Sequence, residues 1–206
     1  MNFIVQGYRS ARGKKRHSYF QPMSCIEIVF YYKDTRELQK ITESNLKIFF
    51  HTLQSDPAKI TLGVVGLEIF DHAVKEHEQN FVLYDFLKQF LLSLETNQDP
   101  LIHHFLFFLV HLTTCLGFFP HVEAENPEAP LFFDLLNGTV MNVPVRPNTD
   151  RVLLDFISAN PENCRQISLN NAQKKNLIAQ MLEYYKHHIE GFRDPESLKV
   201  FEEVMQ

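Results

Sequence analysis

The pattern of hydrophobic and polar positions changes near residue 54. Before that point, short runs of β-branched and aromatic residues alternate with polar ones, which predicts strands over residues 2–8 and 25–32 and one or two strands over 38–50. After it, apolar residues recur every three or four positions, which predicts helices over 57–78, 80–96, 100–117, 149–159, 170–190 and 195–205. We therefore expect an α+β protein with a small N-terminal sheet in residues 1–54 and a helical domain in 55–206.

Three Asp-Pro pairs indicate where helices begin, because Asp caps free N–H groups and Pro lacks the N–H that would need a partner. These pairs are Asp56-Pro57, Asp99-Pro100 and Asp194-Pro195. The helix over 100–117 is apolar nearly all round, so we expect it at the centre of the bundle. The helix over 80–96 has one predicted apolar stripe, formed by Phe81, Tyr84, Leu87, Leu91 and Leu94.

Two glycine motifs have structural interpretations. Asn137-Gly138 lies between apolar runs at 132–136 and 139–143, which predicts a β-hairpin because both residues tolerate positive φ. Gly63 and Gly66 have the spacing of the G-x-x-G loop of KH domains. No basic residue lies between them, and the surrounding run is amphipathic. Close helix packing is therefore the better interpretation.

Charge is unevenly distributed along the chain. Residues 1–16 contain five Lys or Arg and no Asp or Glu, so the net charge of −5 leaves −10 for the remainder. This basic strip predicts contact with a polyanion, since Lys and Arg bound to phosphates release counterions. Nearby Tyr8, Tyr19 and Phe20 are candidates for stacking on unpaired bases. A solvated loop and a nuclear localisation signal are the alternatives. The strip consists of Arg9, Arg12, Lys14, Lys15 and Arg16. Lys33, Arg36, Lys40 and Lys47 are candidates to extend this polyanion surface along the sheet.

Other chemistry is weakly supported by the sequence. Cys25, Cys115 and Cys164 are far apart and form no C-x-x-C pair, which favours a reducing compartment without a disulfide or zinc framework. The ten histidines form no H-E-x-x-H motif, so core-edge or surface positions are expected for them. No nucleophile elbow or phosphate-binding loop is present, which predicts that the protein is not an enzyme. The sequence has no signal peptide and no apolar run of membrane-spanning length, so we expect an intracellular protein.

Several segments, in this order, resemble the RecO family of bacterial recombination mediators, and in particular its Bacteroidetes-like members. No single segment is specific; the collinear set is. The segments are Val5-Gln6-Gly7-Tyr8-Arg9-Ser10, Phe20-Gln21-Pro22, Glu27-Ile28-Val29-Phe30, Leu38-Gln39-Lys40-Ile41, Leu116-Gly117-Phe118-Phe119-Pro120 and Ser197-Leu198-Lys199-Val200.

The resemblance implies an N-terminal OB-fold barrel followed by a helical bundle with a small inserted region that often binds zinc. The family's barrel starts with two strands ahead of the segment matching residues 2–9, so we expect an incomplete barrel here, through truncation or a misassigned start codon. Residues 119–147 contain no cysteine, and His121 alone cannot replace four zinc ligands. We therefore predict no metal and no cofactor, with the hairpin and prolines of 118–147 held by packing.

The resemblance also implies a function in DNA repair. Such a protein binds single- and double-stranded DNA, anneals complementary strands, and with RecR helps to load RecA onto strands coated by single-stranded-DNA-binding protein, in the bacterial cytoplasm at the nucleoid. The basic strip is the expected DNA contact. His103 and His104 are candidates for binding the acidic, apolar C-terminal tail of the single-stranded-DNA-binding protein, the alternative being two helix-surface histidines. The competing class is a protein-only interaction module whose incomplete barrel does not bind DNA.

Overall fold

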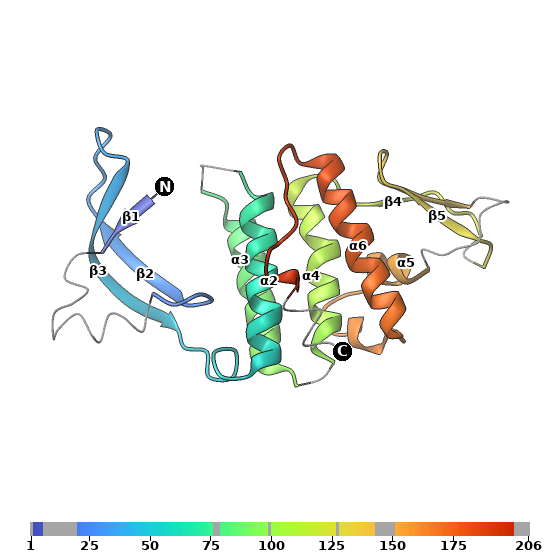
Figure 1. Cartoon of the computed structure of the whole chain (residues 1–206), viewed down its shortest axis with the longest axis horizontal. Helices are drawn as coiled ribbons and strands as arrows, with labels where there is room; N and C mark the ends of the chain where they lie inside the picture. Colours follow the sequence, from blue (N-terminus) through green and yellow to red (C-terminus); the bar gives the residue numbers. More distant parts are fainter. Residues whose placement is uncertain are drawn as a thin grey trace.

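The computed structural model describes residues 2–5, 20–75, 79–98, 100–126, 128–142 and 151–199. Figure 1 shows a sheet of strands β1, β2 and β3 at one end, a group of helices in the middle and a smaller sheet at the other end. Strands and helices thus occupy separate parts of the chain. This arrangement agrees with the predicted α+β class.

The N-terminal sheet has the strand order β1-β3-β2. Strand β1 spans Asn2–Ile4, β2 spans Cys25–Phe30 and β3 spans Leu38–Ile48, so residues 38–48 form one strand. β1 is parallel to β3 and β2 is antiparallel to it. The register shifts between Val29 and Phe30, which pair with Glu43 and Ile41. The skipped Thr42 donates its hydroxyl to the Val29 carbonyl at 2.8 Å, so this position is a β-bulge.

Burial in this sheet is slight. Every residue of β1 is exposed, and β2 has only exposed and half-buried positions. In β3 the two buried residues are polar, Gln39 and Ser44. The three strands therefore contribute no buried hydrophobic side chain to a core.

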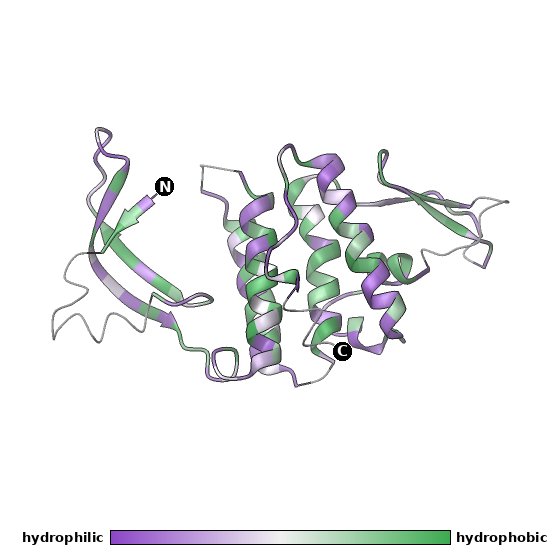
Figure 2. Ribbon diagram, in the orientation of Figure 1, coloured by the Kyte–Doolittle hydropathy of each residue, from purple (hydrophilic) through white to green (hydrophobic). Residues whose placement is uncertain are grey.

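The helical body consists of α2 (Pro57–Ala73), α3 (Phe81–Thr96), α4 (Leu101–Leu116), α5 (Arg151–Ser158) and α6 (Asn171–His188), with a 3₁₀ turn η1 (Cys164–Gln166). α4 packs against α2, α3, α5, α6 and η1, which confirms its central position. Figure 2 shows α4 hydrophobic along most of its length, whereas α6 alternates in polarity. Among the described residues no helix is both long and apolar enough to cross a membrane.

The predicted helix starts are confirmed in part. Asp56 caps α2 by accepting hydrogen bonds from the N–H groups of Ala58 and Lys59, with Pro57 in the first turn. α4 starts at Leu101 with Pro100 at its N-cap and no side-chain cap, one position later than the Asp-Pro rule predicts. Asp99 lies outside the described residues. After Pro195, helical geometry begins at residue 198, and the predicted helix from 200 onward lies outside the described residues.

The predicted stripe of α3 is partly wrong. Leu91 and Leu94 are buried, but Phe81 and Tyr84 are 68% and 50% exposed. The helix packs on α2 and α4 through Leu83, Phe90 and Leu94, three positions on one side of a helix with 3.6 residues per turn. Phe81 and Tyr84 lie in the first turns of α3, where this side is exposed, whereas Leu91, about two turns after Tyr84 on the same side, is buried.

The glycines of α2 do allow close packing. A Cβ on Gly66 would lie 2.4 Å from the ring of Phe90, and one on Gly63 would lie 2.2 Å from the sulfur of Met23. Both distances are far shorter than a real contact. The packing interpretation of this motif is therefore confirmed.

The second sheet has the order β4-β6-β5, with β4 at His121–Val122, β5 at Leu131–Asp134 and β6 at Thr139–Asn142. The hairpin at Asn137-Gly138 is confirmed, but its loop has four residues, 135–138, and only Gly138 has positive φ. The reason is Asp134, whose carboxylate accepts hydrogen bonds from the N–H groups of Leu136 and Asn137. A two-residue loop of type I′ would need positive φ at both of its residues. Here the four-residue loop is stabilised by the Asp134 side chain instead.

Candidate nucleic-acid and partner interfaces

All five residues of the basic strip, Arg9, Arg12, Lys14, Lys15 and Arg16, lie outside the described residues. The described part of the predicted DNA path is the β2–β3 hairpin, which carries Lys33, Arg36, Lys40 and Lys47. We call residues 31–38, which connect β2 to β3 and include the first residue of β3, the hairpin tip. Every residue of the hairpin tip is exposed.

Two adjacent aromatic side chains distinguish this tip. Tyr31 is 77% exposed and Tyr32 is 61% exposed, and Lys33 follows directly. Exposed aromatic rings beside cations are the elements that single-strand binders use, since a base stacks on the ring while the cation neutralises a phosphate. Sequence reasoning assigned these tyrosines to a half-buried strand and so missed them as candidate binding residues.

A buried glutamine fixes the shape of the tip. Gln39 is 2% exposed and its side chain is bonded three times to the loop. Its Oε1 accepts from the N–H of Lys33 at 3.0 Å, while its Nε2 donates to the carbonyls of Lys33 at 3.0 Å and Arg36 at 2.7 Å. The amide thereby adds to the backbone hydrogen bond from the N–H of Arg36 to the carbonyl of Lys33. Together these bonds join the loop of the tip to the start of β3.

The charge of this hairpin is modest. Asp34 and Glu37 lie in the tip beside Lys33 and Arg36. On β3, Lys47 forms an ion pair with Glu27 of β2 at 3.4 Å, whereas Lys40 is exposed near the tip. The described cations are therefore partly offset by carboxylates. The hairpin therefore has exposed aromatic rings and a few cations. Its positive charge is too small for a strong polyanion site by itself.

The segment after β3 is anchored to the helical body by one carboxylate. Glu95 of α3 accepts hydrogen bonds from the backbone N–H groups of His51 at 2.8 Å, Thr52 at 3.0 Å and Leu53 at 2.7 Å. Buried Lys59 donates to the Thr52 hydroxyl and to the Glu95 carbonyl, both at 2.8 Å. These bonds join residues 51–53 to α2 and α3.

The same contacts change the acidity of Glu95. Its partial burial on its own would raise the pKa, but the hydrogen bonds from the backbone of Leu53, His51 and Thr52 outweigh this and lower the pKa to about 2. The carboxylate is thus ionised throughout the physiological range. The junction between the sheet and the helices therefore contains an ionised carboxylate that accepts from three backbone N–H groups.

His103 and His104 are not helix-surface residues. They are 6% and 5% exposed on α4. The ring N–H of His103 donates to the carbonyl of Ile167 at 2.8 Å, and Nδ1 of His104 lies 3.9 Å from the sulfur of Cys164. Burial lowers the pKa of both rings, so they are neutral at pH 7. Neither therefore supplies a positive charge for an acidic peptide.

A groove with a cationic rim lies instead along α6. It has a volume of about 230 Å³ and an apolar floor of Ile102, Ile178, Leu182 and Leu198. Lys174, Lys175 and Lys186 line it as well. Lys186 is paired with Glu183 at 2.8 Å and Asp194 at 2.7 Å. Among the described residues, Lys174 and Lys175 form no ion pair with the carboxylates of this groove.

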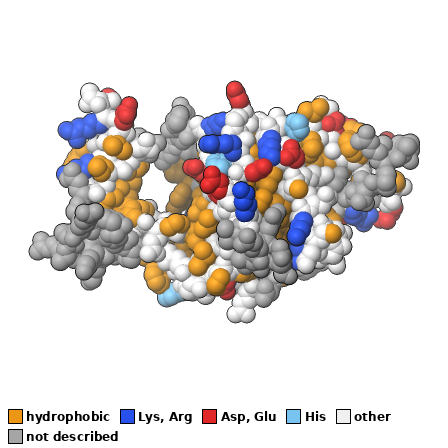
Figure 3. Space-filling model, in the orientation of Figure 1, with side chains coloured by type: hydrophobic (Ala, Val, Ile, Leu, Met, Phe, Trp, Pro, Cys, Tyr) orange, Lys and Arg blue, Asp and Glu red, His pale blue; other side chains and the backbone are white. Residues whose placement is uncertain are grey.

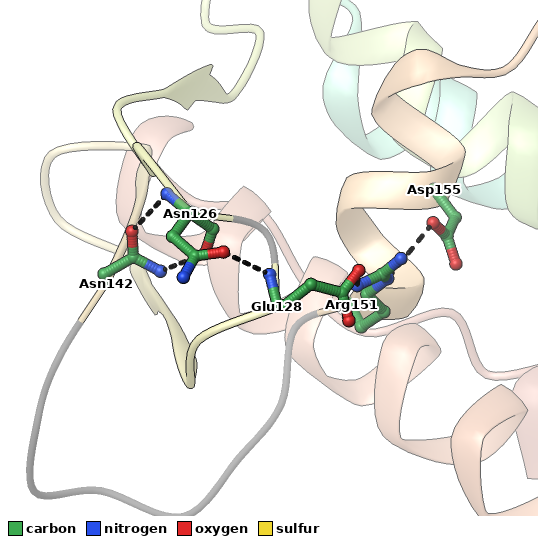
Figure 4. A network of polar contacts seen from close by, with 5 residues as sticks. All are labelled: Asn126, Glu128, Asn142, Arg151 and Asp155. Carbon is green, nitrogen blue, oxygen red and sulfur yellow. Dashed lines mark hydrogen bonds and ion pairs between the residues drawn. The ribbon is translucent and has the colours of Figure 1, made fainter.

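The inserted region is held by polar side chains as well as by packing. Asn142 accepts from the N–H of Asn126 at 3.1 Å and donates to its carbonyl at 2.8 Å (Figure 4). Arg151 of α5 pairs with Glu128 at 3.0 Å and with Asp155 at 3.8 Å. The first pair of bonds closes the insertion on itself, and the Arg151–Glu128 ion pair joins it to α5. The packing expected from the sequence is present too, since Phe133 is buried with its ring 4.9 Å from that of Tyr184.

The donor set of this region does not fit zinc. His121 and Glu123 are 4.0 Å apart at the strand β4, and no cysteine lies in 119–147. In the described part of the chain no three His, Cys, Asp or Glu side chains are grouped as metal ligands. A structural zinc site requires four such donors. We therefore derive no role for a metal here.

Hydrophobic side chains are exposed on both sides of a gap between the sheet and the helices. In Figure 3 this gap is visible as a hollow with hydrophobic atoms on each side. Phe3 and Ile4 of β1 and Phe81 and Val82 of α3 are among the exposed hydrophobic residues of these two parts. At one point β2 and α3 are in contact, where the Cys25 thiol and the Tyr84 hydroxyl are 3.4 Å apart. The sheet and the body thus meet over a small area apart from the junction at Glu95.

Comparisons with known proteins place this architecture in a class. The family model "Recombination protein O C terminal" matches residues 54–127. The "DNA repair protein RecO" of Flavobacterium psychrophilum is 27% identical over 206 residues, covering 98% of this chain and 85% of that protein. Those of Christiangramia forsetii and Bacteroides fragilis are 28% and 27% identical, with 98% of this chain covered in each case and 85% and 86% of theirs.

These matches define the class as bacterial proteins of DNA repair and recombination. Within it, the chain is similar to RecO proteins over nearly its whole length, which confirms the resemblance seen in its sequence. The matching relatives are mostly from Bacteroidetes, as the sequence segments indicated.

Proposed function

We propose that this protein is a DNA-binding recombination mediator without enzymatic activity. It binds single- and double-stranded DNA, anneals complementary strands, and acts with RecR and the single-stranded-DNA-binding protein in loading RecA, in the cytoplasm at the nucleoid. The observation that carries this proposal is the similarity to RecO proteins, which align over 98% of the chain. Annealing requires no covalent chemistry, since a surface that screens phosphate repulsion and leaves base edges free is sufficient.

The proposed DNA surface is the N-terminal unit, residues 1–54, which we assign as a partial OB-fold. Arg9, Arg12, Lys14, Lys15 and Arg16 neutralise phosphates, and the hairpin tip adds Tyr31 and Tyr32 as stacking platforms. Support for the second part comes from the exposure of both rings and from the hydrogen bonds between Gln39 and the loop. The cations give affinity without sequence preference, and the rings favour unpaired bases.

The test is a salt titration of binding to a single-stranded oligonucleotide. Replacing the five strip cations by Ser should weaken binding strongly and reduce the slope of log K against log salt by about 0.7 for each lost phosphate contact. Unchanged affinity and slope would remove the strip from the mechanism. Complete failure to bind DNA at low salt, with the fold intact by circular dichroism, would favour the protein-only interaction module.

The tyrosines are tested in the same assay by Tyr31→Ala and Tyr32→Ala. Each should cost about 1–3 kcal/mol of binding free energy if its ring stacks on a base, with the salt slope unchanged. The matched control is Phe81→Ala, which removes an exposed aromatic ring from α3. A loss equal to that of the control would exclude stacking at the tip.

For the acidic tail of the single-stranded-DNA-binding protein we propose the groove along α6. Its apolar floor suits the tail's apolar end, and Lys174 and Lys175 complement its carboxylates. The earlier candidates, His103 and His104, stay a prediction, but their burial and neutral state favour the groove.

Two double variants with the same change in charge separate the two interfaces. Lys174→Gln with Lys175→Gln should weaken binding of a tail peptide by about tenfold or more, equivalent to about 1.4 kcal/mol, and leave DNA binding largely intact. Lys40→Gln with Lys47→Gln should do the reverse, weakening DNA binding and sparing the peptide. Equal effects of both variants on the peptide would show that net charge, and not the groove, controls binding of the tail.

A further inference from the structure

The groove along α6 has lysine side chains near both of its ends. Its lining residues on α6 recur every three or four positions, so the groove follows one face of the helix. Lys174 and Lys175 line it near the start of the helix and Lys186 near the end. The apolar Ile178 and Leu182 lie between them. The rise per residue of an α-helix puts about 17 Å along the axis between Lys175 and Lys186, which an extended peptide spans with about five residues.

The two ends differ in whether a carboxylate already occupies them. Among the described residues, Lys174 and Lys175 form no ion pair with the carboxylates of the groove. Lys186 donates to Glu183 of the same helix at 2.8 Å and to Asp194, in the segment after α6, at 2.7 Å. The hydrogen bond to Asp194, followed by that to Glu183, raises the pKa of Lys186. One positive charge shared by two carboxylates repels a third carboxylate unless one of the two leaves.

The segment after α6 is attached to α2 through its main chain. It turns back at the end of α6 and runs beside α2 (Figure 1). Glu68 of α2 accepts hydrogen bonds from the N–H groups of Glu196 at 2.7 Å and Ser197 at 3.0 Å. The ring N–H of His72, on the same helix, donates to the carbonyl of Arg193 at 2.8 Å. These bonds hold the main chain before and after position 194, so the aspartate side chain can leave the lysine while the segment stays in place.

The same segment places two kinds of side chain in the groove. Asp194 lies at Lys186, and Leu198 forms part of the apolar floor. An acidic and an apolar side chain are also what a bound acidic, apolar peptide would supply. The ion pair is accessible to such a ligand, because 33% of the Lys186 side chain and 51% of the Asp194 side chain are exposed. Exposed pairs of this kind contribute little to stability, so the exchange of one carboxylate for another costs little.

We propose that Asp194 occupies the second acid-binding end of this groove in the free protein and that a carboxylate of the bound ligand takes its place on Lys186. The ligand is then a peptide with carboxylates on both sides of an apolar centre, because its acids must reach Lys174 and Lys175 at one end and Lys186 at the other. This inference rests on the peptide binding proposed for the groove, and it adds the arrangement of charges that the peptide must have.

The test compares two peptides of the same composition, acetyl-Asp-Asp-Leu-Phe-Leu-Asp-Asp-amide and acetyl-Asp-Asp-Asp-Asp-Leu-Phe-Leu-amide, each titrated into the ¹⁵N-labelled full chain. Asp194→Asn should strengthen binding of the first peptide relative to the second by about twofold to fivefold, because it frees Lys186 from an exposed ion pair. The control Glu196→Gln removes an equal charge from the same segment, at an exposed residue that does not line the groove. It should leave the ratio of the two affinities unchanged. An equal gain for both peptides, or the same gain in the control, would overturn the proposal.

Dependence on the lysine is tested in Lys186→Gln. In this background Asp194→Asn should no longer change the ratio of the two affinities, and a gain that persists would show that the aspartate acts through net charge alone. The wild-type protein gives a readout that needs no variant. The side-chain carboxyl ¹³C signal of Asp194 should move on saturation with the first peptide and not with the second. A stationary signal with the first peptide bound would contradict the displacement.

Two outcomes distinguish the role of Asp194 from peptide binding itself. If neither the wild type nor Asp194→Asn binds either peptide, the groove is not a peptide site, and the proposed function of the groove fails together with this role. If both peptides bind with equal affinity to the wild type and to every variant, the groove remains a peptide site and only the role of Asp194 is excluded.

Discussion

The N-terminal sheet and the helical body differ in how they use hydrophobic residues. The strands β1, β2 and β3 bury none, and their two buried side chains are the polar Gln39 and Ser44. The central helix α4 buries hydrophobic side chains along its whole length, and five other elements pack around it. The body therefore has a core of its own. The sheet depends on strand pairing and on its attachment to the body.

This difference separates stability from binding. Tyrosines and lysines remain exposed on the hairpin because no core draws them inward, and they are thus available to a ligand. In the body, polar residues serve the fold, as when His103, His111 and His188 each donate to a backbone carbonyl of a distant segment. The junction at Glu95 is where the two kinds of region are coupled.

The largest predicted contrast comes from truncating one aliphatic side chain in each region. Leu109→Ala removes a fully buried side chain from α4 and should lower the free energy of unfolding by about 2–5 kcal/mol, since it leaves a cavity in a packed core. Ile28→Ala removes a half-buried side chain from β2 and should cost about 1 kcal/mol or less, because solvent already reaches the site. Denaturant unfolding followed by far-ultraviolet circular dichroism measures both.

The comparison would fail if the two variants lost equal stability, because the sheet would then contribute as much to a common core as α4 does. A change in the denaturant slope of either variant, without a change in midpoint, would point instead to an altered denatured state.

Much of the fold followed from the sequence because it depends on local rules. The periodic apolar positions predicted five helices, and four of them lie within two residues of their expected bounds. The fifth, α2, ends at Ala73, five residues before the predicted end, although Asp56 caps its start as the Asp-Pro pair predicts. Asn137-Gly138 marks a real hairpin. The stripe of α3 was predicted poorly, since helical spacing identifies an apolar side but not which neighbours cover it. Phe81 and Tyr84 are exposed for that reason.

The candidate interfaces were harder to predict. The distribution of charge along the sequence indicated a surface for a polyanion. The described part of that surface is positioned by residues that are uncharged, or that are distant in sequence from their partners. Gln39 follows the hairpin tip as an ordinary strand residue, and only the folded chain brings its amide to Lys33 and Arg36. Likewise Glu95 is 42 residues from Leu53, whose N–H it accepts. Such long-range polar contacts have no sequence period.

A smaller effect on stability is expected at the junction, and this effect depends on pH. Glu95→Gln should lower the free energy of unfolding at pH 7 by about 1–3 kcal/mol, since charge-assisted hydrogen bonds to three backbone N–H groups become neutral ones. The expected loss of unfolding free energy is no larger than this because the Glu95 side chain is only partly buried, so that water competes for its hydrogen bonds. Glu43→Gln, at an exposed position of β3, is the control for loss of one charge.

The pH dependence follows from the sign of the shift. The folded pKa of about 2 lies below the value of 4.5 for an unperturbed glutamate, so the unfolded chain binds the proton first as pH falls. Glu95 therefore stabilises the native state fully above about pH 4.5 and loses this contribution between 4.5 and 2. Wild-type stability should decline more steeply over that window than that of Glu95→Gln, with Glu43→Gln following the wild type. Parallel profiles for the wild type and Glu95→Gln would mean that residues 51–53 hold their position without this carboxylate, and the sheet would then be attached to the body chiefly through Lys59 and the buried side chains of Phe50 and Leu53.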